Sequence, residues 1–581
     1  MAQPSPVLLQ GEFSVTPCKQ REFSISPRKS SATKCTVSLT VSTITYSPED
    51  KAKGGAQEIQ IGDVVGCEVE GQAETDKDVS FSVYHYPYKP KFLTRKEVRQ
   101  REKVSFAVSG LTDPGEVLRT AERWCRFIQR LLQGETTDDL SDVRKEEEKR
   151  LLVLINPFGG SGRAKHMFED KAAPLLTEAG FKLDVIVTER AGHGYDIARK
   201  VPLGKYCGIV VVSGDGLFNE VGNGLIHHTD QEEALKLPIG VLPGGSSNAH
   251  CVSFLHSAGE SFRQDPFTHA AFLIARHRPH PMDVFAVDTC RGRRMYGWLS
   301  LSWGFMADVD IESERFRLLG TARFQIGVAT RLLNLRRYKG KLHYKPADDN
   351  HAQTTNEDNS VNGSIENGSI ENSSNIANGL ETGDSAIPGL ERPLSGAEGT
   401  TDETASPTNQ SQKQILDTEV DINLSDEPKV FKPKELPTRY LPAISDPVPD
   451  DWLTIEDEFI YVVVVNHKFV DPDVMTVPYA EVDDGLLYLQ YMRATPDISR
   501  GRVVEVMMAM PEGKHIYQGL IKTIKVKAFR IEPLTEGAVM TVDGETIPYG
   551  PMQGEVLPSK TNVMAGCTHK KRTPAYCEAE L

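Results

Sequence analysis

The sequence predicts a doubly wound α/β domain followed by an antiparallel β-sandwich. Three observations predict this fold class. After residue 150, short apolar runs alternate with helix-length segments, which is typical of a parallel sheet covered on both faces. After about residue 285, strand-like runs dominate. A stretch of dense negative charge without Phe, Trp or Tyr interrupts the second half and predicts a disordered acidic insert.

Length and composition exclude several classes of protein. The 581 residues exceed the ~250–300 at which a single core stops growing, so two or more domains are expected. No apolar run approaches the ~20 residues of a membrane-spanning helix, and the first residues lack the pattern of a secretory signal. With 39% hydrophobic and 25% charged residues, the chain fits a soluble globular protein rather than collagen, a coiled-coil rod or a disulfide scaffold.

The net charge of −15 is concentrated in one stretch. Residues 347–430 hold 17 acidic and 3 basic residues, so the rest of the chain is close to neutral. A near-neutral folded part does not indicate a nucleic-acid-binding surface. The nine cysteines form no Cys-x-x-Cys pair, which argues against a zinc knuckle and favours the reduced thiols of a cytosolic protein.

Residues 1–145 are expected to form a β-rich N-terminal extension. Its strand-like runs are 36–46, 59–69 and 80–86. An amphipathic helix is expected over 114–132, and the charged run at 142–150 is typical of a solvated segment. No residue here indicates catalysis, so we expect a β domain used for packing or recruitment.

Residues 146–285 carry the α/β pattern. The runs expected as buried strands are 151–156, 183–188, 209–213 and 239–242. The helix-length segments between and after them are about 164–179, 193–200 and 216–227. This alternation predicts parallel strands joined by helices.

Residues 286–346 and 449–566 are expected to form the β-rich second domain. The strands expected in this half are 284–289, 296–302, 340–344, 459–466, 485–492, 523–531 and 538–542. The disordered acidic insert is assigned to 347–448, because this composition cannot bury enough apolar surface to offset its ordering entropy. Residues 567–581 form a tail.

Each of the four predicted parallel strands ends in a polar or glycine-rich loop. The loops are Asn156-Pro-Phe-Gly-Gly-Ser-Gly-Arg163, Thr188-Glu-Arg-Ala-Gly192, Ser213-Gly-Asp-Gly216 and Pro243-Gly-Gly-Ser-Ser-Asn248. Ligands of an open parallel sheet bind beyond the carboxyl ends of its strands. Glycine lets backbone N–H groups approach a phosphate, and a following helix N-terminus adds partial positive charge. We therefore expect phosphate binding, although no Walker A, protein-kinase or G-x-G-x-x-G motif is present.

Asp215 lies between two glycines and is the expected general base. An aspartate in a tight turn is usually a cap. Beside nucleotide phosphates, it can instead take the proton of an attacking hydroxyl. Glu220, on the following helix, is expected either to orient this site or to be a solvated helix carboxylate.

In order and spacing, these loops resemble the catalytic domain of the diacylglycerol-kinase superfamily. The second half narrows the resemblance to the sphingosine kinases. The similar segments are Ser300-Leu-Ser-Trp-Gly-Phe-Met-Ala-Asp-Val-Asp-Ile-Glu-Ser-Glu-Arg-Phe-Arg317, then Gly320 and Arg323, and Thr541-Val-Asp-Gly-Glu-Thr-Ile-Pro-Tyr-Gly550. The resemblance covers about 150–345 and 450–566, and the extension and insert resemble the larger animal form.

The resemblance implies a nucleotide-binding α/β domain and a lipid-binding β-sandwich, with ATP and Mg²⁺ as cofactors and no metal ligand assigned. The residues implied to bind ATP are Asn156, Pro157, Phe158, Thr188, Glu189, Arg190, Ala191, Gly192, Ser213, Gly214, Glu220, Gly245, Ser246, Ser247, Arg317, Arg323, Asp543, Gly544 and Glu545. The residues implied to contact the lipid substrate are Ser213, Gly214, Asp215, Gly216, Ser300 and Asp310.

The resemblance also implies roles for individual side chains. Asp310 is implied to bind the ammonium and hydroxyls of a sphingoid base, and its spacing from Arg317 would place both on one helix face. Two positions depart from the family pattern. Ser247 replaces a glycine of the usual Gly-Ser-Gly, and Asn219 stands where vertebrate members usually have His.

Residues 323–341 predict a basic amphipathic helix. Val328, Leu332 and Leu335 recur at helical spacing among basic residues. Such a helix is expected either to cover the lipid pocket or to bind a calcium-sensor protein or a membrane surface.

We therefore expect a cytoplasmic, peripherally membrane-associated kinase that phosphorylates the primary hydroxyl of sphingosine and related long-chain bases. Three alternatives remain. Asp310 suits a cationic head group, which disfavours a diacylglycerol or ceramide kinase. The intact Asp215, Arg317, Arg323 and Asp543 disfavour a non-catalytic scaffold. The segment around Asp310 and the second β domain disfavour an NAD-kinase-like enzyme.

Overall fold

The structure is a computed structural model that describes part of the chain. The described residues are 6–19, 32–50, 52, 54–71, 79–90, 96–135, 148–292, 294–313, 322–347, 422, 434–496 and 498–566. For residues 18, 19 and 322–325 it describes the backbone only. Most of the predicted insert and all of the predicted tail therefore lie outside the described residues.

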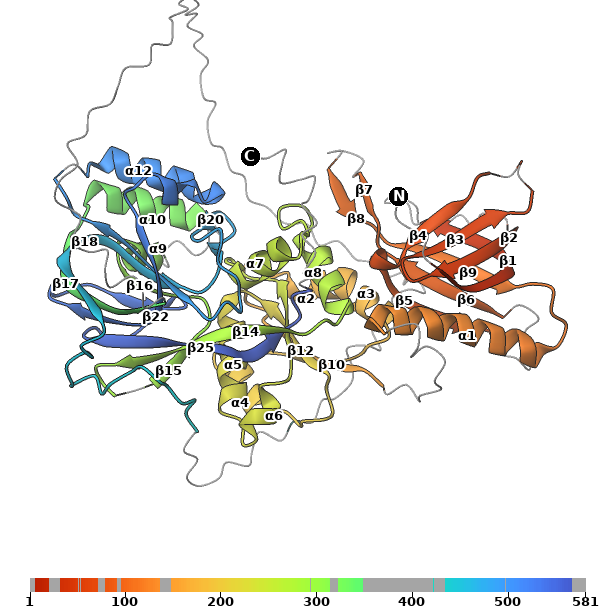
Figure 1. The fold of residues 1–581 in the computed structure, drawn as a ribbon, viewed down its shortest axis with the longest axis horizontal. Coiled ribbons are helices and arrows are strands. Elements are labelled where there is room, and N and C mark those ends of the chain that lie inside the picture. The colour runs from red at the N-terminus through yellow and green to blue at the C-terminus, as the bar shows by residue number, and fades with distance from the viewer. Residues whose placement is uncertain are drawn as a thin grey trace, which may run out of the picture. The chain divides into compact units, whose positions relative to one another are not determined.

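The N-terminal extension forms a seven-stranded antiparallel sheet in the order β4-β3-β2-β1-β9-β6-β5 (Figure 1). Its strands are β1 (Val7–Lys19), β2 (Thr33–Thr40), β3 (Thr43–Pro48), β4 (Gln57–Gln60), β5 (Val64–Glu70), β6 (Ser80–His85) and β9 (Glu102–Val108). A small hairpin is formed by β7 (Tyr88–Pro90) and β8 (Glu97–Arg99). The predicted helix is confirmed as α1 (Pro114–Gln133), which packs Trp124 against Phe81.

Two predicted strands of this extension are each divided. The run 36–46 is an antiparallel pair, β2 and β3, because the Thr40 hydroxyl accepts hydrogen bonds from the N–H groups of Ser42 and Thr43 and turns the chain. The run 59–69 is divided by a 3-10 turn at Ile61–Asp63. Strands β1 and β9 were not predicted.

The α/β pattern is confirmed in residues 150–275. Parallel strands lie in the order β11-β10-β12-β13. These strands are β10 (Arg150–Ile155), β11 (Lys182–Val187), β12 (Gly208–Ser213) and β13 (Ile239–Pro243). The helices are α2 (Ala164–Met167), α3 (Ala173–Glu178), α4 (His193–Arg199), α5 (Asp215–Ile226), α6 (Gln231–Ala234), α7 (Ala249–Ser257) and α8 (Pro266–Ala275). A π-helical turn, Phe168–Ala172, joins α2 to α3, so the predicted helix 164–179 is an interrupted one.

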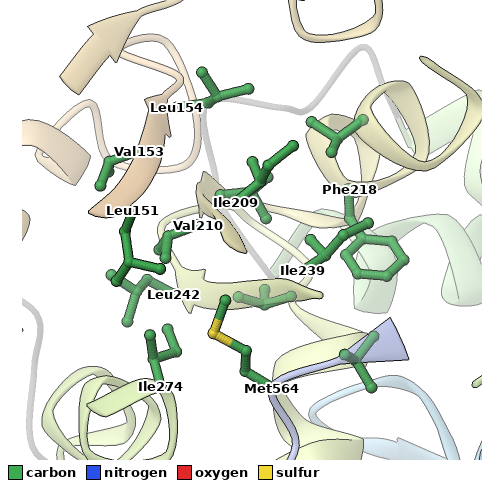
Figure 2. Packing of buried hydrophobic residues seen from close by; sticks show 14 of the residues in the cluster. Leu151, Val153, Leu154, Ile209, Val210, Phe218, Ile239, Leu242, Ile274 and Met564 are labelled. Atoms are coloured by element: carbon green, nitrogen blue, oxygen red, sulfur yellow. The ribbon is translucent and has the colours of Figure 1, made fainter. Parts of the chain in front are cut away.

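The core of this part lies on both faces of the parallel strands. Figure 2 shows Leu151 and Val153 of β10, Val210 of β12 and Ile239 of β13 among the packed side chains. Met564 also belongs to this core, although it lies far along the chain. Burial on both faces explains why these strands read as continuous apolar runs.

The second half continues the same sheet. After β13 the order is β25-β22-β17-β18-β16-β23-β24, with β14 paired to β15 and β25, and β21 paired to β18 and β22. These strands are β14 (His280–Thr289), β15 (Arg294–Gly297), β16 (Ser300–Gly304), β17 (Tyr338–Pro346), β18 (Leu453–Val465), β21 (Leu487–Arg493), β22 (Lys522–Pro533), β23 (Met540–Val542), β24 (Glu545–Thr546) and β25 (Met552–Val563). Every pair among them is antiparallel.

Three helices and a small hairpin lie outside this sheet. They are α9 (Phe305–Ser313), α10 (Ala322–Leu333), α12 (Arg500–Ala509) and the pair β19 (Phe469–Asp471) and β20 (Val474–Met475). The helix predicted over 323–341 ends at Leu333, and Tyr338 already pairs with Phe459 in β17. The extension of that helix to 341 is therefore wrong, because the basic residues 339 and 341 belong to a strand.

Residues 434–448, which the composition assigns to the insert, pack against the sheet. The N–H of Leu436 donates to the Tyr296 hydroxyl at 2.7 Å. The N–H groups of Arg439 and Tyr440 donate to the Glu555 carboxylate, and Ile422 packs against the α/β core. Apart from Ile422, the described residues of the second half therefore begin again at residue 434, within the range predicted as insert.

Buried ionic contacts join the β7–β8 hairpin of the N-terminal extension to the α/β part of the chain. The Arg99 guanidinium donates to Glu260 at 2.6 and 2.8 Å and to Asp63 at 3.0 Å. The Glu260 carboxylate also lies 2.7 Å from Nδ1 of His269 and accepts a hydrogen bond from the Tyr88 hydroxyl at 2.6 Å. These four side chains form one network around Glu260.

Cysteine and membrane predictions are tested only for the described residues. Six cysteines in this part are free thiols: Cys35, Cys67, Cys125, Cys207, Cys251 and Cys290. Among the described helices, none combines the length and the apolar character needed to cross a membrane.

Candidate active site

One cavity of about 1010 Å³ reaches from the carboxyl ends of β10, β12 and β13 to helices α9, α10 and α12. Its lining divides by chemistry. The polar part is formed by the loops after the parallel strands together with residues 543–545. The apolar part is lined by Leu299, Met306, Val309, Val328, Leu332, Val470, Val474, Val504, Met507, Met508 and Pro511.

Glycines let the backbones of three loops touch. A Cβ at Gly245 would lie 2.3 Å from the Cα of Gly214, so any side chain there would separate the loops after β12 and β13. Gly160 has φ 53°, and its Cβ would lie 2.9 Å from the Gly244 carbonyl oxygen. Ser247, the departure from the family pattern, needs no positive φ, so a serine fits its backbone.

Asn156 fixes the first of these loops. Its Nδ2 donates to the Ser213 hydroxyl at 3.3 Å, and its Oδ1 accepts from the N–H of Phe158 at 3.0 Å. Phe158 is 76% exposed and lines the cavity. The side chain of Asn156 therefore ties β10 to β12 at the edge where the phosphates are expected.

Asp215 is almost buried, with 9% of its surface exposed, and it faces helix α7. Its carboxylate accepts from the N–H groups of Ala249 and His250 at 3.0 Å each and lies 2.7 Å from Nδ1 of His250. Burial alone would raise the pKa of this carboxyl, but these hydrogen bonds outweigh burial and lower the pKa. Asp215 is therefore held as a carboxylate.

Glu220 caps helix α4. Its two carboxylate oxygens accept from the N–H groups of Gly192 and Gly194 at 2.8 and 2.9 Å. Together with the contacts of Asp215, this contact shows that carboxylates from α5 occupy the N-termini of both α4 and α7. These four N–H groups are therefore already hydrogen-bonded to carboxylates.

Asp543 anchors the turn between β23 and β24. Its carboxylate accepts from the N–H groups of Trp298, Leu299 and Ser300 at 2.7 to 2.9 Å and from Asn219 Nδ2 at 2.8 Å. Burial raises the pKa of this carboxyl. These contacts divide the predicted strand 296–302 into β15 and β16, and they give Asn219 a structural partner.

Asp310 lines the cavity from helix α9. A Cβ at Gly544 would lie 3.4 Å from its Oδ2, so the aspartate adjoins the β23–β24 turn. Asp308, two residues earlier on the same helix, faces inward instead. Its carboxylate accepts a hydrogen bond from the Tyr338 hydroxyl and lies 3.4 Å from the Arg331 guanidinium. The two aspartates of this helix therefore lie in different environments: Asp310 at the cavity, and Asp308 in an internal contact with Tyr338 and Arg331.

Most of the predicted site residues line this one cavity. They are Asn156, Phe158, Thr188, Arg190, Ala191, Ser213, Gly214, Asp215, Gly216, Glu220, Gly245, Ser246, Ser247, Ser300, Asp310, Asp543, Gly544 and Glu545. Pro157, Glu189 and Gly192 are not among its lining residues but adjoin ones that are. Arg317 lies outside the described residues, as does the side chain of Arg323.

The sequence reasoning missed Asp471, Asp473 and the residues of α12. Asp471 lines the cavity, and its Oδ2 has no hydrogen-bond partner among the described residues. Burial, with the nearby charges of Asp473 and Asp215, raises its pKa to about 6. Helix α12 was not predicted, although Val503, Val506 and Met507 stand at helical spacing.

No group of three or more metal-ligating side chains occurs within the described ranges. A nucleotide-bound Mg²⁺ needs only one or two protein carboxylates, since phosphates supply other ligands. Glu545 is exposed, lines the polar part of the cavity and lies beside Gly544. The residues present therefore fit a metal carried by a nucleotide.

Comparison with known protein families finds a matching family for the α/β half and another for the β-rich half of the chain. Residues 150–287 match the family described as diacylglycerol kinase catalytic domain, and residues 450–565 match the family described as YegS C-terminal NAD kinase beta sandwich-like domain. Sphingosine kinase 1 of Homo sapiens is 31% identical over 72% of this chain and 91% of its own length. A crystal structure described as a diacylglycerol kinase from Bacillus anthracis covers 72% of this chain and 98% of its own, with 15% identity and a TM-score of 0.39.

One relative aligns along almost the whole chain, including the N-terminal extension. Sphingosine kinase 2 of Homo sapiens is 31% identical over 97% of this chain and 93% of its own length. Since this identity extends over nearly both full lengths, the protein belongs to the sphingosine kinase family.

Proposed function

We propose that the protein transfers the γ-phosphoryl group of ATP to the primary hydroxyl of sphingosine and related long-chain bases, giving sphingosine 1-phosphate. The observation that carries this proposal is the single cavity. Glycine-rich loops suited to phosphates line its polar part, an apolar lining suited to an alkyl chain forms the rest, and the same lining includes Asp215 and Asp310.

Asp215 is proposed as the general base. A carboxylate has about four lone-pair positions, and three here accept hydrogen bonds from α7. The fourth, on Oδ2, is left for the substrate hydroxyl. As the hydroxyl oxygen attacks the γ-phosphorus, its proton passes to Asp215 and the bond to the β–γ bridging oxygen breaks. A weak base suffices, because a loose transition state needs little deprotonation before phosphorus–oxygen bond formation.

Asp310 is proposed to bind the ammonium group. A charged partner distinguishes a sphingoid base from the neutral head groups of diacylglycerol and ceramide. Nucleotide binding is proposed for the residues implied by the resemblance, with Arg317 and Arg323 on the phosphates. Mg²⁺, when bound with ATP, neutralises phosphate charge, and Glu545 is the carboxylate proposed to hold it.

Peripheral membrane contact and a cytoplasmic location are also proposed. Sphingosine has to leave a bilayer to reach the cavity, and Met508, which lines the apolar part, is 76% exposed. A calcium-sensor contact at 323–341 stays a prediction. Val328, Leu332 and Leu335 pack against the neighbouring core, and Arg331 is buried, so such a contact would use the exposed Arg336 and Arg337 after α10.

The division into an extension (1–145), an ATP-binding domain (146–285), a lipid-binding domain (286–346 and 449–566), an insert (347–448) and a tail (567–581) is kept as a proposal. The proposed activity is tested by incubating the purified protein with labelled ATP, Mg²⁺ and separate samples of sphingosine, ceramide and diacylglycerol. We expect label in sphingosine alone. Labelled diacylglycerol without labelled sphingosine would contradict the role of Asp310.

A further inference from the structure

His250 is the residue on which this inference rests, and neither the sequence reasoning nor the family resemblance assigned it a role. It occupies the second position of α7 and has no exposed surface. It touches Asp215 twice, through its backbone N–H at 3.0 Å and through Nδ1 at 2.7 Å. A buried histidine on the proposed base is therefore part of the site.

The hydrogen positions on the His250 ring follow from its partners. An ionised carboxylate can only accept hydrogen bonds, so Nδ1 carries the hydrogen and donates to Asp215. Nε2 is buried and has no hydrogen-bond partner among the described residues. Nδ1 is therefore the ring nitrogen that serves Asp215.

Aromatic neighbours hold the ring in place. Phe218 stacks on it, with ring centroids 4.2 Å apart and an interplanar angle of 24°. His467 approaches edge-on at 5.0 Å, and Phe254 lies at 6.2 Å. Contacts on these sides leave the ring little freedom to turn Nδ1 away from the carboxylate.

The charged and titratable groups around the pair come from four elements. On α5 and α7 these are Asp215 and Cys251, and Asp543 at the β23–β24 turn also acts electrostatically on His250. Asp471 of β19 acts on Asp215. His467 is neutral, because burial lowers its pKa to about 3, and the charge of Lys468 acts on it in the same direction. His250 is thus the side chain that hydrogen-bonds Asp215 directly.

We propose that His250 is a positioning residue that donates from Nδ1 to Asp215, keeping this carboxylate ionised and leaving its Oδ2 directed at the substrate hydroxyl. This inference rests on the proposed function, in which Asp215 is the base. It adds a buried Asp–His pair that fixes the orientation of the base and the pH range in which it stays ionised. Oδ1 accepts both bonds from His250, and Oδ2 accepts only one, from Ala249.

The test compares the pH dependence of kcat for the full chain and three variants, with sphingosine in micelles and saturating ATP. His250→Leu removes the donor and keeps an apolar side chain. His250→Asn keeps an N–H donor near the position of Nδ1. His515→Leu is the matched control, since it removes another fully buried histidine, one that does not line the cavity.

We expect His250→Leu to lower kcat about tenfold or more at neutral pH, because the base is less well oriented. Losing a charge-assisted hydrogen bond should also move the acidic limb of its pH profile upward by about one to two pH units. His250→Asn should restore most of the wild-type profile, and His515→Leu should leave the profile in place. ATP affinity should be unchanged in all three variants.

A His250→Leu profile that matches His515→Leu would overturn the inference, as would failure of His250→Asn to restore the profile. If His250→Leu does not fold, the Asn variant still decides, because a purely structural role would not track the donor. Nitrogen-15 NMR of labelled histidine gives an independent readout. A His250 ring protonated only on Nε2 would contradict the inference even if the protein acted on another lipid, whereas inactive wild-type protein with the Nδ1–H ring would contradict only the proposed function.

Discussion

Replacing Asp215 by asparagine should separate its catalytic role from its structural one. The amide can accept on Oδ1 from both donors of His250, but its NH₂ group would face the N–H of Ala249, 3.0 Å from the present Oδ2. One hydrogen bond at the start of α7 is therefore lost, at a cost of about 0.5–2 kcal/mol in the free energy of unfolding. Loss of the base should lower kcat about 10²–10⁴-fold.

Three measurements check this prediction: label transfer to sphingosine in micelles, ATP affinity by calorimetry, and the thermal unfolding midpoint. ATP affinity should be unchanged, because the carboxylate is directed at α7. Asp230→Asn is the matched control, since Asp230 caps α6 through the N–H of Glu233 and does not line the cavity. It should change stability little, because Asn caps a helix about as well as Asp, and it should leave kcat unchanged. Near-normal turnover of Asp215→Asn would refute the role of the base.

Three further predictions concern other parts of the chain. Asp310→Ala should weaken the apparent affinity for sphingosine by about 2–5 kcal/mol and leave ATP affinity unchanged, because it removes the partner of a partly buried ammonium; steady-state kinetics with each substrate varied would contradict this if ATP affinity alone fell. Deleting 350–414 should change the free energy of unfolding by about 1 kcal/mol at most and keep activity in micelles, since loop-closure entropy varies slowly with length. It should also increase binding to anionic vesicles at low salt, where the negative segment is repelled; inactive or insoluble deleted protein would contradict this division of the chain. Finally, burial would raise the pKa of Glu260, but hydrogen bonds from His269 and Arg99 lower it to about 2. A lowered pKa adds stability that is present above the unfolded value of about 4.3 and is lost as the pH falls toward 2. Glu260→Gln should abolish that part of the acid dependence of chemical denaturation, and an unchanged dependence would show that the network around Glu260 contributes little.

The α/β layer could be predicted because each of its signals is local. The strand β10 is a continuous apolar run, since both of its faces are covered. The glycine-rich loop that follows it indicates the edge of the sheet where ligands bind. The loop around Asp215 could be found in the same way, because short-range sequence order creates it.

The remaining parts depend on contacts that sequence order does not reveal. In the sequence, nothing distinguishes His250 from an ordinary helix residue. Its contact with Asp215 is seen only in the fold, where α7 lies against that carboxylate. The role of Glu220 as a cap on α4 could not be read for the same reason. Strand β25 alternates weakly and contains Pro558, so it was missed although it pairs with β14 along most of its length. Asp471 gave no signal, because a carboxylate in a short hairpin is usually solvated.

The position of β25 in the sheet has a consequence for biosynthesis. This strand pairs with β13, β14 and β22, and residues next to it complete the core of the α/β layer. A ribosome adds about 5–20 residues per second, so β13 and β14 wait many seconds for a partner that is made hundreds of residues later. During that time their edges are open to pairing with other chains. The nascent chain therefore has a long interval in which the α/β half is made but unfinished, and chaperones that shield sheet edges would act during that interval.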